Sequence, residues 1–137
     1  MTHYTKMDVA AAKDSDGREH VMIEGVARAP SIVHASKRMG DNLSFLLQDN
    51  SGFIRVEITL EQLLPLVVNK KALEKWGSDT YLKPIEQMLQ ASSESGVPVT
   101  VQGCTCGNSL FDAKQRGGHF NYLIMHGLLF DGRYLQF

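Results

Sequence analysis

A hairpin pattern at residues 44–56 constrains the fold of this chain more than any other feature. The segment reads SFLLQDNSGFIRV, in which two short apolar stretches flank a polar turn that ends at Gly52. On both sides of the turn, apolar side chains occupy alternate positions: Leu43, Phe45, Leu47, Ile54, Val56 and Ile58. A period of two is typical of strands with one buried face. The sequence therefore predicts two antiparallel strands that share a core, joined by a tight turn in which glycine takes a positive φ.

The rest of the chain predicts three more strands and two helices. Residues 18–29, 97–105 and 119–130 alternate in the same way, and Gly25 marks an expected bulge or bend in the first of them. Residues 60–95 instead carry apolar side chains at helical spacing, interrupted by a break at GSD, which predicts two helices. In the last strand we expect one side to face the core: Phe120, Tyr122, Ile124 and His126.

The order of these elements is three strands, two helices and two strands, which is the order of an oligonucleotide/oligosaccharide-binding (OB) barrel. Residues 44–56 also resemble the strand 2–3 hairpin of OB-fold nucleic-acid-binding domains of the replication-protein and tRNA-anticodon type. That family pattern runs Phe-x-Leu-x-Asp-x-(Ser/Thr)-Gly-x-Ile-x-Val. The residues in register with it are Phe45, Leu47, Asp49, Ser51, Gly52, Ile54 and Val56. The resemblance implies an all-β core with a helical insert, namely a five-stranded OB-fold Greek-key barrel with two helices between strands 3 and 4.

Length and composition fit one such domain. The chain has 137 residues, of which 43% are hydrophobic and 21% charged, the ordinary range for a globular protein. We expect a single OB-fold domain over residues 1–137, with an N-terminal extension at 1–19 and the helical insert at 60–95. No apolar run reaches the roughly 18 residues of a membrane span, and the N-terminal segment lacks the apolar core of a signal peptide. We therefore expect a cytoplasmic protein with no membrane association.

The outward side of the hairpin is the candidate binding surface. If the apolar set points inward, then Gln48, Phe53 and Arg55 point outward. OB folds bind ligands across this face, between the loops that follow strands 1 and 4, and here those loops carry basic and aromatic residues. An exposed ring can stack on a base while a nearby cation meets a phosphate. The candidate nucleic-acid-binding residues are Phe53, Arg55, Lys37, Arg38, Gln48, Phe111, Lys114 and Arg116.

Each of these side chains also has a plainer interpretation. Phe53 could pack beneath the N-terminal segment or against a dimer partner. Arg55 could simply pair with Glu57, as exposed charges of opposite sign often do. Phe111 could fold its loop onto the barrel, and the basic loop residues could be no more than solvated.

Metal binding and catalysis are not predicted. Cys104, Cys106, His119 and His126 are soft or borderline ligands, but Cys-x-Cys alone lacks the paired spacing of a structural zinc site. The two cysteines lie too close along one strand for an easy mutual disulfide, which fits a reducing compartment. The sequence contains no phosphate-binding glycine loop, zinc-protease helix or nucleophile elbow. We therefore expect a non-enzymatic binding protein with no cofactor and no metal.

Two functions fit this pattern. The first is a single-stranded nucleic-acid-binding protein, with DNA favoured over RNA, acting as a non-catalytic accessory factor in replication, repair or recombination. The alternative is an OB-fold protein-interaction subunit, acting as a homodimer or complex component through the helices at 60–95. The net charge of −1 argues against a strong nonspecific polyelectrolyte binder, and Trp76, Tyr81 and Leu82 could form an exposed apolar patch. Oligosaccharide binding is a third hypothesis, with no sequence feature of its own.

Overall fold

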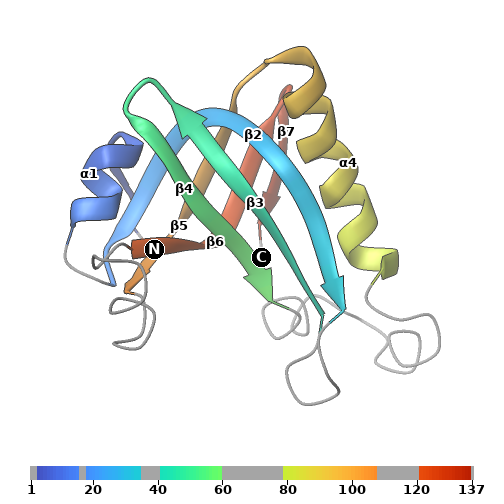
Figure 1. The fold of residues 1–137 in the computed structure, drawn as a ribbon, viewed down its shortest axis with the longest axis horizontal. Coiled ribbons are helices and arrows are strands. Elements are labelled where there is room, and N and C mark those ends of the chain that lie inside the picture. The colour runs from blue at the N-terminus through green and yellow to red at the C-terminus, as the bar shows by residue number, and fades with distance from the viewer. Residues whose placement is uncertain (1–2, 16–17, 35–40, 60–78, 108–120, 137) are drawn as a thin grey trace.

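Five strands close into a barrel in the computed structural model of this protein. The structure describes residues 3–15, 18–34, 41–59, 79–107 and 121–136. The barrel strands are β2 (His20–His34), β3 (Asp41–Asp49), β4 (Gly52–Thr59), β5 (Val99–Gly107) and β6 (Asn121–Phe130). They are hydrogen-bonded in the order β2-β3-β4-β6-β5, and β5 pairs with β2 to complete the ring (Figure 1). Only the pairing of β4 with β6 is parallel among these five. The closed barrel is compatible with an OB-like fold.

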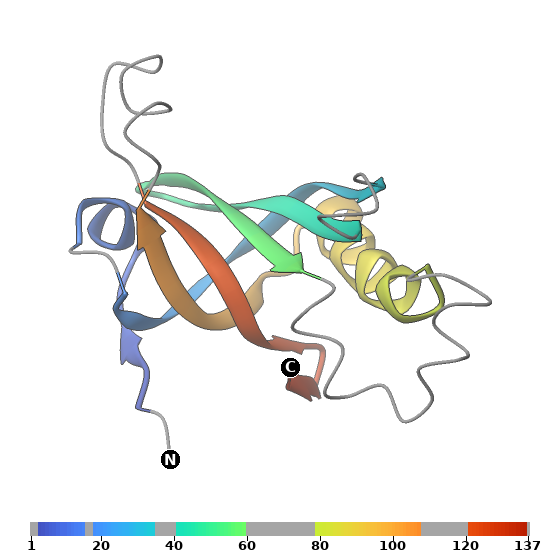
Figure 2. The same cartoon turned by 90° about the horizontal axis from the view of Figure 1, so that it is seen from below.

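Two short strands and two helices complete the described structure. They are β1 (Thr5–Lys6), α1 (Val9–Asp14), α4 (Asp79–Ser95) and β7 (Arg133–Gln136). β1 pairs in parallel with β2, and β7 pairs antiparallel with β6. The two helices lie at opposite ends of the barrel (Figure 2). Of the helices in the described part of the chain, neither combines the length and apolarity that a membrane span requires.

The placement of the helices matches the prediction only in part, since α4 lies within the predicted insert at 60–95. Two were expected between strands 3 and 4, whereas α4 lies between β4 and β5, because β1 precedes the barrel strands. One predicted helix covers residues 60–76, which lie outside the described residues. The other described helix, α1, belongs to the N-terminal extension, for which no element was predicted. It has only six residues, too few to display a helical period in the sequence.

The register of the hairpin is as predicted. Phe45 lies opposite Val56, and Leu47 lies opposite Ile54. All four side chains are at most 2% exposed, so both strands contribute their alternating apolar set to the interior. Gly52 has φ 144° at the start of β4, a backbone conformation that favours glycine.

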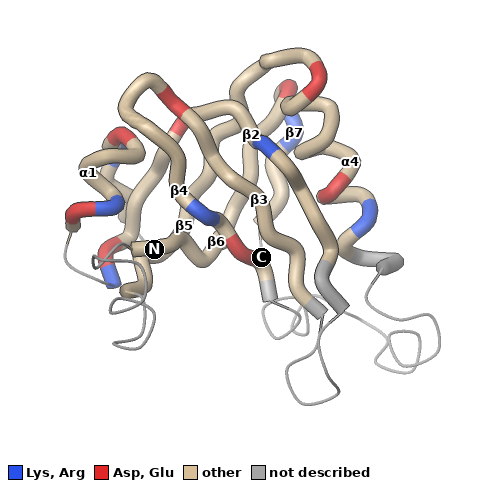
Figure 3. Tube along the Cα trace, viewed as in Figure 1, with Lys and Arg blue, Asp and Glu red and all other residues tan. Residues whose placement is uncertain are grey.

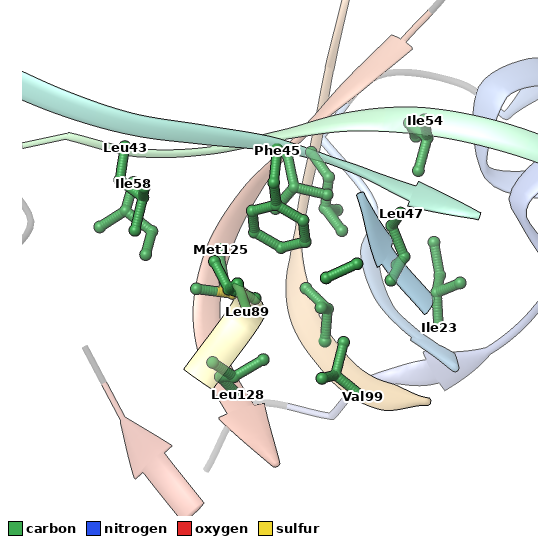
Figure 4. Close-up of a cluster of buried hydrophobic side chains, with 14 of the residues drawn as sticks. Ile23, Leu43, Phe45, Leu47, Ile54, Ile58, Leu89, Val99, Met125 and Leu128 are labelled. Atoms are coloured by element: carbon green, nitrogen blue, oxygen red, sulfur yellow. The ribbon is translucent and has the colours of Figure 1, made fainter. Parts of the chain in front are cut away.

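The core is shared by the barrel strands and by both helices. Figure 4 shows Phe45 of β3 near Met125 of β6 and Leu89 of α4. At the other end, α1 adds Val9 and Ala12, and both side chains are completely buried. Full burial of a large aliphatic or aromatic side chain contributes about 1.5–3 kcal/mol. Each helix therefore closes one end of the barrel and adds apolar surface to its interior.

β2 bends because it pairs with two strands in succession. Its first half pairs with β5 and its second half with β3. The register shifts between Arg28 and Ser31, where Ala29 adopts φ 51°. Gly25, the predicted bulge, stays in register with β5, but a Cβ there would lie 2.6 Å from the carbonyl oxygen of Gln48. This glycine therefore permits close approach of β2 and β3 rather than a bulge.

The predicted inner face of β6 is wrong. Tyr122, Ile124 and His126 were expected in the core, but all three are only partly buried and alternate with the buried positions. The buried apolar residues of β6 are instead Leu123, Met125 and Leu128. Both alternating sets are rich in apolar residues, so periodicity could not choose between them; pairing with β4 and β5 decides which set faces inward. Phe120 lies outside the described residues.

Polar residues of the hairpin turn anchor α1 to the barrel. The Asp49 carboxylate accepts a hydrogen bond from the Val9 amide at 2.9 Å, and the Ser51 hydroxyl accepts one from the next amide at 2.9 Å. At the other end of α1, the Asn121 side chain donates to the Ala12 carbonyl at 3.0 Å. Burial opposes ionisation of Asp49, but hydrogen bonds from Ser51 and Val9 hold its pKa below the usual value. Two residues of the family motif thus have a structural role.

Candidate functional site

The outward-facing side chains of β2, β3 and β4 form one surface, the hairpin wall. Its members are Arg28, Leu46, Gln48, Phe53, Arg55 and Glu57. Leu46 of β3 lies opposite both Arg28 of β2 and Arg55 of β4, and Gln48 lies opposite Phe53 in the neighbouring row. The wall therefore presents two guanidinium groups on either side of a leucine, next to a row that contains an aromatic ring.

Phe53 faces solvent, as the sequence predicted. It is 56% exposed, although it follows the turn glycine and precedes the buried Ile54 on the same strand. The Nζ atom of Lys13 on α1 lies 5.5 Å from the ring centroid, within the range of a cation–π contact. The N-terminal segment thus places a cation near the ring and leaves more than half of the residue accessible.

Arg55 is engaged by two neighbours on the wall. Its Nε atom lies 3.3 Å from Oε1 of Glu57, so Arg55 does form the ion pair given above as its plainer interpretation. This Nε atom is buried and has no partner with hydrogen-bond geometry. The guanidinium carbon lies 4.8 Å from the ring centroid of Tyr122 on β6. The Arg55 side chain remains 40% exposed, so the group is oriented by these contacts but still reachable from solvent.

Tyr122 was not predicted at this site, because its side of β6 was expected to face the core. Its hydroxyl interacts with the Cys106 thiol, and this hydrogen bond, burial and the nearby charge of Glu57 raise the pKa of Tyr122 to about 12, against the opposing effect of Arg55. The phenol is therefore neutral at physiological pH. A neutral ring beneath a guanidinium orients the cation without cancelling its charge.

Arg28 was also missed, although it extends the wall onto β2. Its Nε donates to the side-chain oxygen of Gln48 at 3.2 Å, and one terminal nitrogen donates to the Ser93 carbonyl at 3.1 Å. The side chain is exposed. Strand alternation could have identified Arg28 as outward-facing, because Ala27 lies in the core and the next residue along a strand points the other way. Gln48, which was predicted, is exposed and holds this arginine in place.

A polar concavity adjoins the wall at the end of the hairpin. It has a volume of about 530 Å³ and lies between β2, the hairpin turn and the chain that links α4 to β5. Its polar lining includes Glu24, Arg28, Gln48 and Asn50. Arg28 and Gln48 therefore belong both to the wall and to this recess.

The other predicted binding residues fall outside the described part of the chain. They are Lys37, Arg38, Phe111, Lys114 and Arg116. Of the eight predicted residues, the structure describes Gln48, Phe53 and Arg55 and brings them together on the hairpin wall.

The cysteines lie beside this wall and show no metal-site geometry. Cys104 and Cys106 are both free and partly buried on β5. Burial and the neighbouring Cys106 raise the pKa of the Cys104 thiol, so it is protonated at neutral pH. Within the described ranges, no three His, Cys, Asp or Glu side chains are grouped so that they could hold a metal ion. His119 lies outside those ranges.

Comparison with known proteins adds no family to this description. No protein-family model matches the chain, and no curated protein matches it.

Proposed function

We propose that the hairpin wall binds single-stranded nucleic acid, with DNA preferred over RNA. In this proposal the protein is not an enzyme and serves as an accessory factor in replication, repair or recombination. The observation that supports it best is the exposed ring of Phe53 one row away from the outward-facing Arg28 and Arg55. Stacking a base on such a ring is worth about 1–3 kcal/mol, and stacking and phosphate contacts need no particular base sequence.

The arrangement of charge on the wall supports a bound backbone. Arg28 lies on β2 and Arg55 on β4, with β3 between them. Two strand spacings separate their backbones by about 10 Å. Figure 3 shows basic segments on β2 and β4 of the same face, with an acidic segment close to the second. Two cations at this spacing can contact different phosphates of one strand, while the net charge of −1 limits binding elsewhere on the surface.

Glu57 limits the affinity that Arg55 can contribute. A phosphate that approaches the Arg55 guanidinium has to compete with the carboxylate at 3.3 Å. Because the pair is partly exposed, its own contribution is small, about 0–1 kcal/mol, so exchange of one anion for the other is inexpensive. We therefore expect weak, salt-sensitive binding rather than tight binding by this surface alone.

Fluorescence anisotropy with labelled oligothymidine at low salt tests the proposal. We expect saturable binding that weakens as salt rises, because phosphate contacts release counterions. A matched oligouridine measures the preference for DNA. Absence of binding at about 50 µM protein would overturn the proposal, since even nonspecific nucleic-acid binding has dissociation constants of about 1–100 µM.

Matched variants localise the binding. Phe53→Ala removes the exposed ring of the hairpin wall, and Tyr134→Ala removes a ring on β7 that is 51% exposed, against 56% for Phe53. Binding that depends on the wall falls with the first variant and is unchanged by the second. Equal loss in both variants would place the ligand elsewhere.

A protein-interaction role is the second candidate, and exposed apolar residues on β6 and β7 favour it. Leu129 and Tyr134 lie opposite each other across these strands and are 42% and 51% exposed. Among the described strands, β7 pairs with β6 alone, which leaves one of its edges for another chain. Static light scattering tests this role. A strictly monomeric protein with no copurifying partner would contradict it.

Leu82 does not contribute to the apolar patch considered for this role at residues 60–95. It could have formed that patch with Trp76 and Tyr81, but it is completely buried in the core. The side chains of Trp76 and Tyr81 are not described. An interaction through β6 and β7 would therefore use a different surface from the predicted one at residues 60–95.

A further inference from the structure

The polar recess beside the hairpin wall has room for a flat polar group. Its lining comes from β2, from the hairpin turn and from the chain between α4 and β5, and its volume is about 530 Å³. Pockets that hold small molecules span about 300–1,000 Å³. Gly96 borders open space, because a Cβ built there would meet nothing within 4 Å. The recess is therefore large enough for one nucleobase.

Glu24 is the carboxylate of the recess that remains available to a ligand. It lies on the outward face of β2 and is exposed. Asp49, the other acidic residue of the lining, already accepts hydrogen bonds from the Val9 amide and from Ser51. Within the described ranges, Glu24 has no hydrogen-bond or ion-pair partner. Its carboxylate can therefore accept two hydrogen bonds from one ligand, one at each oxygen.

Gln48 supplies a donor, because Arg28 fixes the orientation of its amide. The Nε atom of Arg28 donates to Oε1 of Gln48 at 3.2 Å, and a terminal nitrogen of the same guanidinium donates to the Ser93 carbonyl at 3.1 Å. Since an arginine side chain can only donate, it engages the oxygen of the amide and leaves the amino group of Gln48 to donate elsewhere. The recess thus combines a double acceptor with an oriented donor.

We propose that the recess selects a guanine base of a single strand bound along the hairpin wall, an inference that rests on the proposed function. The carboxylate oxygens of Glu24 accept from N1–H and from the 2-amino group of guanine, and the amino group of Gln48 donates to O6. Guanine is the base whose Watson–Crick edge carries two adjacent donors beside an acceptor. Stacking and phosphate contacts do not distinguish the bases, so the recess adds the selectivity that the wall lacks.

The other bases satisfy the recess less well. Adenine and cytosine each place a ring-nitrogen acceptor beside their exocyclic amino group, so one oxygen of Glu24 would face a lone pair. Thymine carries a carbonyl on each side of its single N–H and offers Glu24 the poorest match. We therefore expect guanine to bind best and thymine worst.

The charges of the recess and of the wall assign base and backbone to different places. A carboxylate repels phosphates, so Glu24 disfavours the backbone in the recess, whereas Arg28 and Arg55 attract it to the wall. Gln48 lies opposite Phe53 of β4 and opposite Val26 of β2, so one row of residues leads from the stacking ring to the recess. The row spans two strand spacings, or about 10 Å. Neighbouring bases of one strand can therefore occupy the two positions.

Anisotropy with a short oligothymidine that carries one central guanine tests the proposal on the unmodified protein. Relative to oligothymidine alone, we expect affinity to rise at least about fivefold, the lower end of what one bidentate base contact provides. Hypoxanthine in place of guanine lacks only the 2-amino group, so it keeps purine stacking and should lose most of the gain. Equal affinity for the guanine and hypoxanthine oligonucleotides would overturn the contact with Glu24.

Comparison with oligothymidine separates this inference from the proposed function. If both oligonucleotides bind with equal affinity, the recess does not select guanine, while binding by the hairpin wall stands. If neither oligonucleotide binds, both the inference and the proposed function are overturned.

Variants test whether Glu24 recognises the base. Glu24→Gln places an amino group against the N–H donors of guanine, so the preference for guanine over thymine should be lost. Asp131→Asn is the matched control, since Asp131 is exposed in the turn between β6 and β7 and lies outside the lining of the recess. Its φ of 51° is one that asparagine tolerates. A guanine preference that survives in both variants would contradict the proposal.

Competition with dGMP distinguishes a base within a strand from a free nucleotide. The nucleotide offers the same base edge but no neighbouring base for Phe53 and no second phosphate for the wall. We expect dGMP to displace the guanine oligonucleotide only at concentrations far above the dissociation constant of that oligonucleotide. Displacement at concentrations near that constant would make the recess a mononucleotide site and would overturn the proposal.

Discussion

Two walls of one barrel carry rings and basic groups but use them in opposite ways. On the hairpin wall, Phe53 is 56% exposed, and the guanidinium groups of Arg28 and Arg55 carry a permanent charge. On the β5 wall, formed by the outer faces of β2, β5 and β6 with the adjoining β1, the rings of Tyr4, His20 and His126 pack on one another, with centroids about 6 Å apart. Permanent charge beside an open ring suits a ligand, whereas rings that pack on one another cover part of each other's surface.

The N-terminal extension touches both walls. The Tyr4 hydroxyl lies 3.2 Å from Nδ1 of His126 on the β5 wall, and further along the same segment Lys13 lies 5.5 Å from the ring of Phe53. Between them, α1 closes the end of the barrel through buried Val9 and Ala12. The difference between the walls therefore depends on where one short segment is held. The predictions below test the hairpin wall and the contact between α1 and the hairpin turn.

The largest expected effect is the loss of nucleic-acid binding in Phe53→Ala. Removal of a stacking ring should cost about 1–3 kcal/mol, or about 5- to 150-fold in affinity, measured by anisotropy with oligothymidine. Tyr134→Ala, which removes an equally exposed ring from β7, should leave affinity unchanged. If the two variants lose the same affinity for oligothymidine, the hairpin wall is not the binding surface.

The next largest effect is on stability, and it concerns the hydrogen bonds that anchor α1 to the hairpin turn. Asp49→Ala removes the carboxylate that accepts from the Val9 amide, and should lower the free energy of unfolding by about 1.5–3 kcal/mol in urea denaturation at pH 7. Because the pKa of Asp49 is lowered in the fold, this stabilisation is present above about pH 4 and is lost as pH falls through the folded value. A difference between the proteins that persists unchanged at pH 2 would contradict this assignment.

Arg28→Gln should weaken binding by a smaller amount and change its dependence on salt. If Arg28 contacts one phosphate, the slope of log affinity against log salt should become shallower by about 0.7 for a single strand. Arg133→Gln on β7, where the side chain is also exposed, is the matched control. An unchanged slope in Arg28→Gln would exclude a phosphate contact at this position.

The smallest expected effect is an increase in affinity for nucleic acid. Glu57→Gln removes the carboxylate that lies 3.3 Å from Arg55, so a phosphate no longer competes for the guanidinium. Affinity for oligothymidine should rise about two- to fivefold, in line with the small worth of an exposed ion pair. Glu94→Gln on the exposed side of α4 removes the same charge away from the wall and controls for net charge. A loss of affinity in Glu57→Gln would show that this carboxylate supports the site.

Much of the hairpin was predictable because its two faces differ in polarity. Apolar residues fill every alternate position from Leu43 to Leu47 and from Ile54 to Ile58, and most residues between them are polar. One register therefore buries this set, and the same pattern predicts Phe53 and Arg55 outside. β6 was predicted with the wrong face inward, because Leu123 and Ile124 are equally apolar and only pairing distinguishes them. Arg28 could have been found from alternation along β2, had the curvature of that strand been known.

The sequence alone determined which side of the β3–β4 hairpin is core and which residues that hairpin offers to solvent, because side-chain direction along a strand follows from a local period of two. Tertiary structure decided everything that joins distant segments: the stacking of Arg55 on Tyr122, the docking of α1 by Asp49, and the meeting of Tyr4 with His126. Such contacts depend on how strands close into a barrel. Periodicity within one segment carries no information about which other segment will lie beside it.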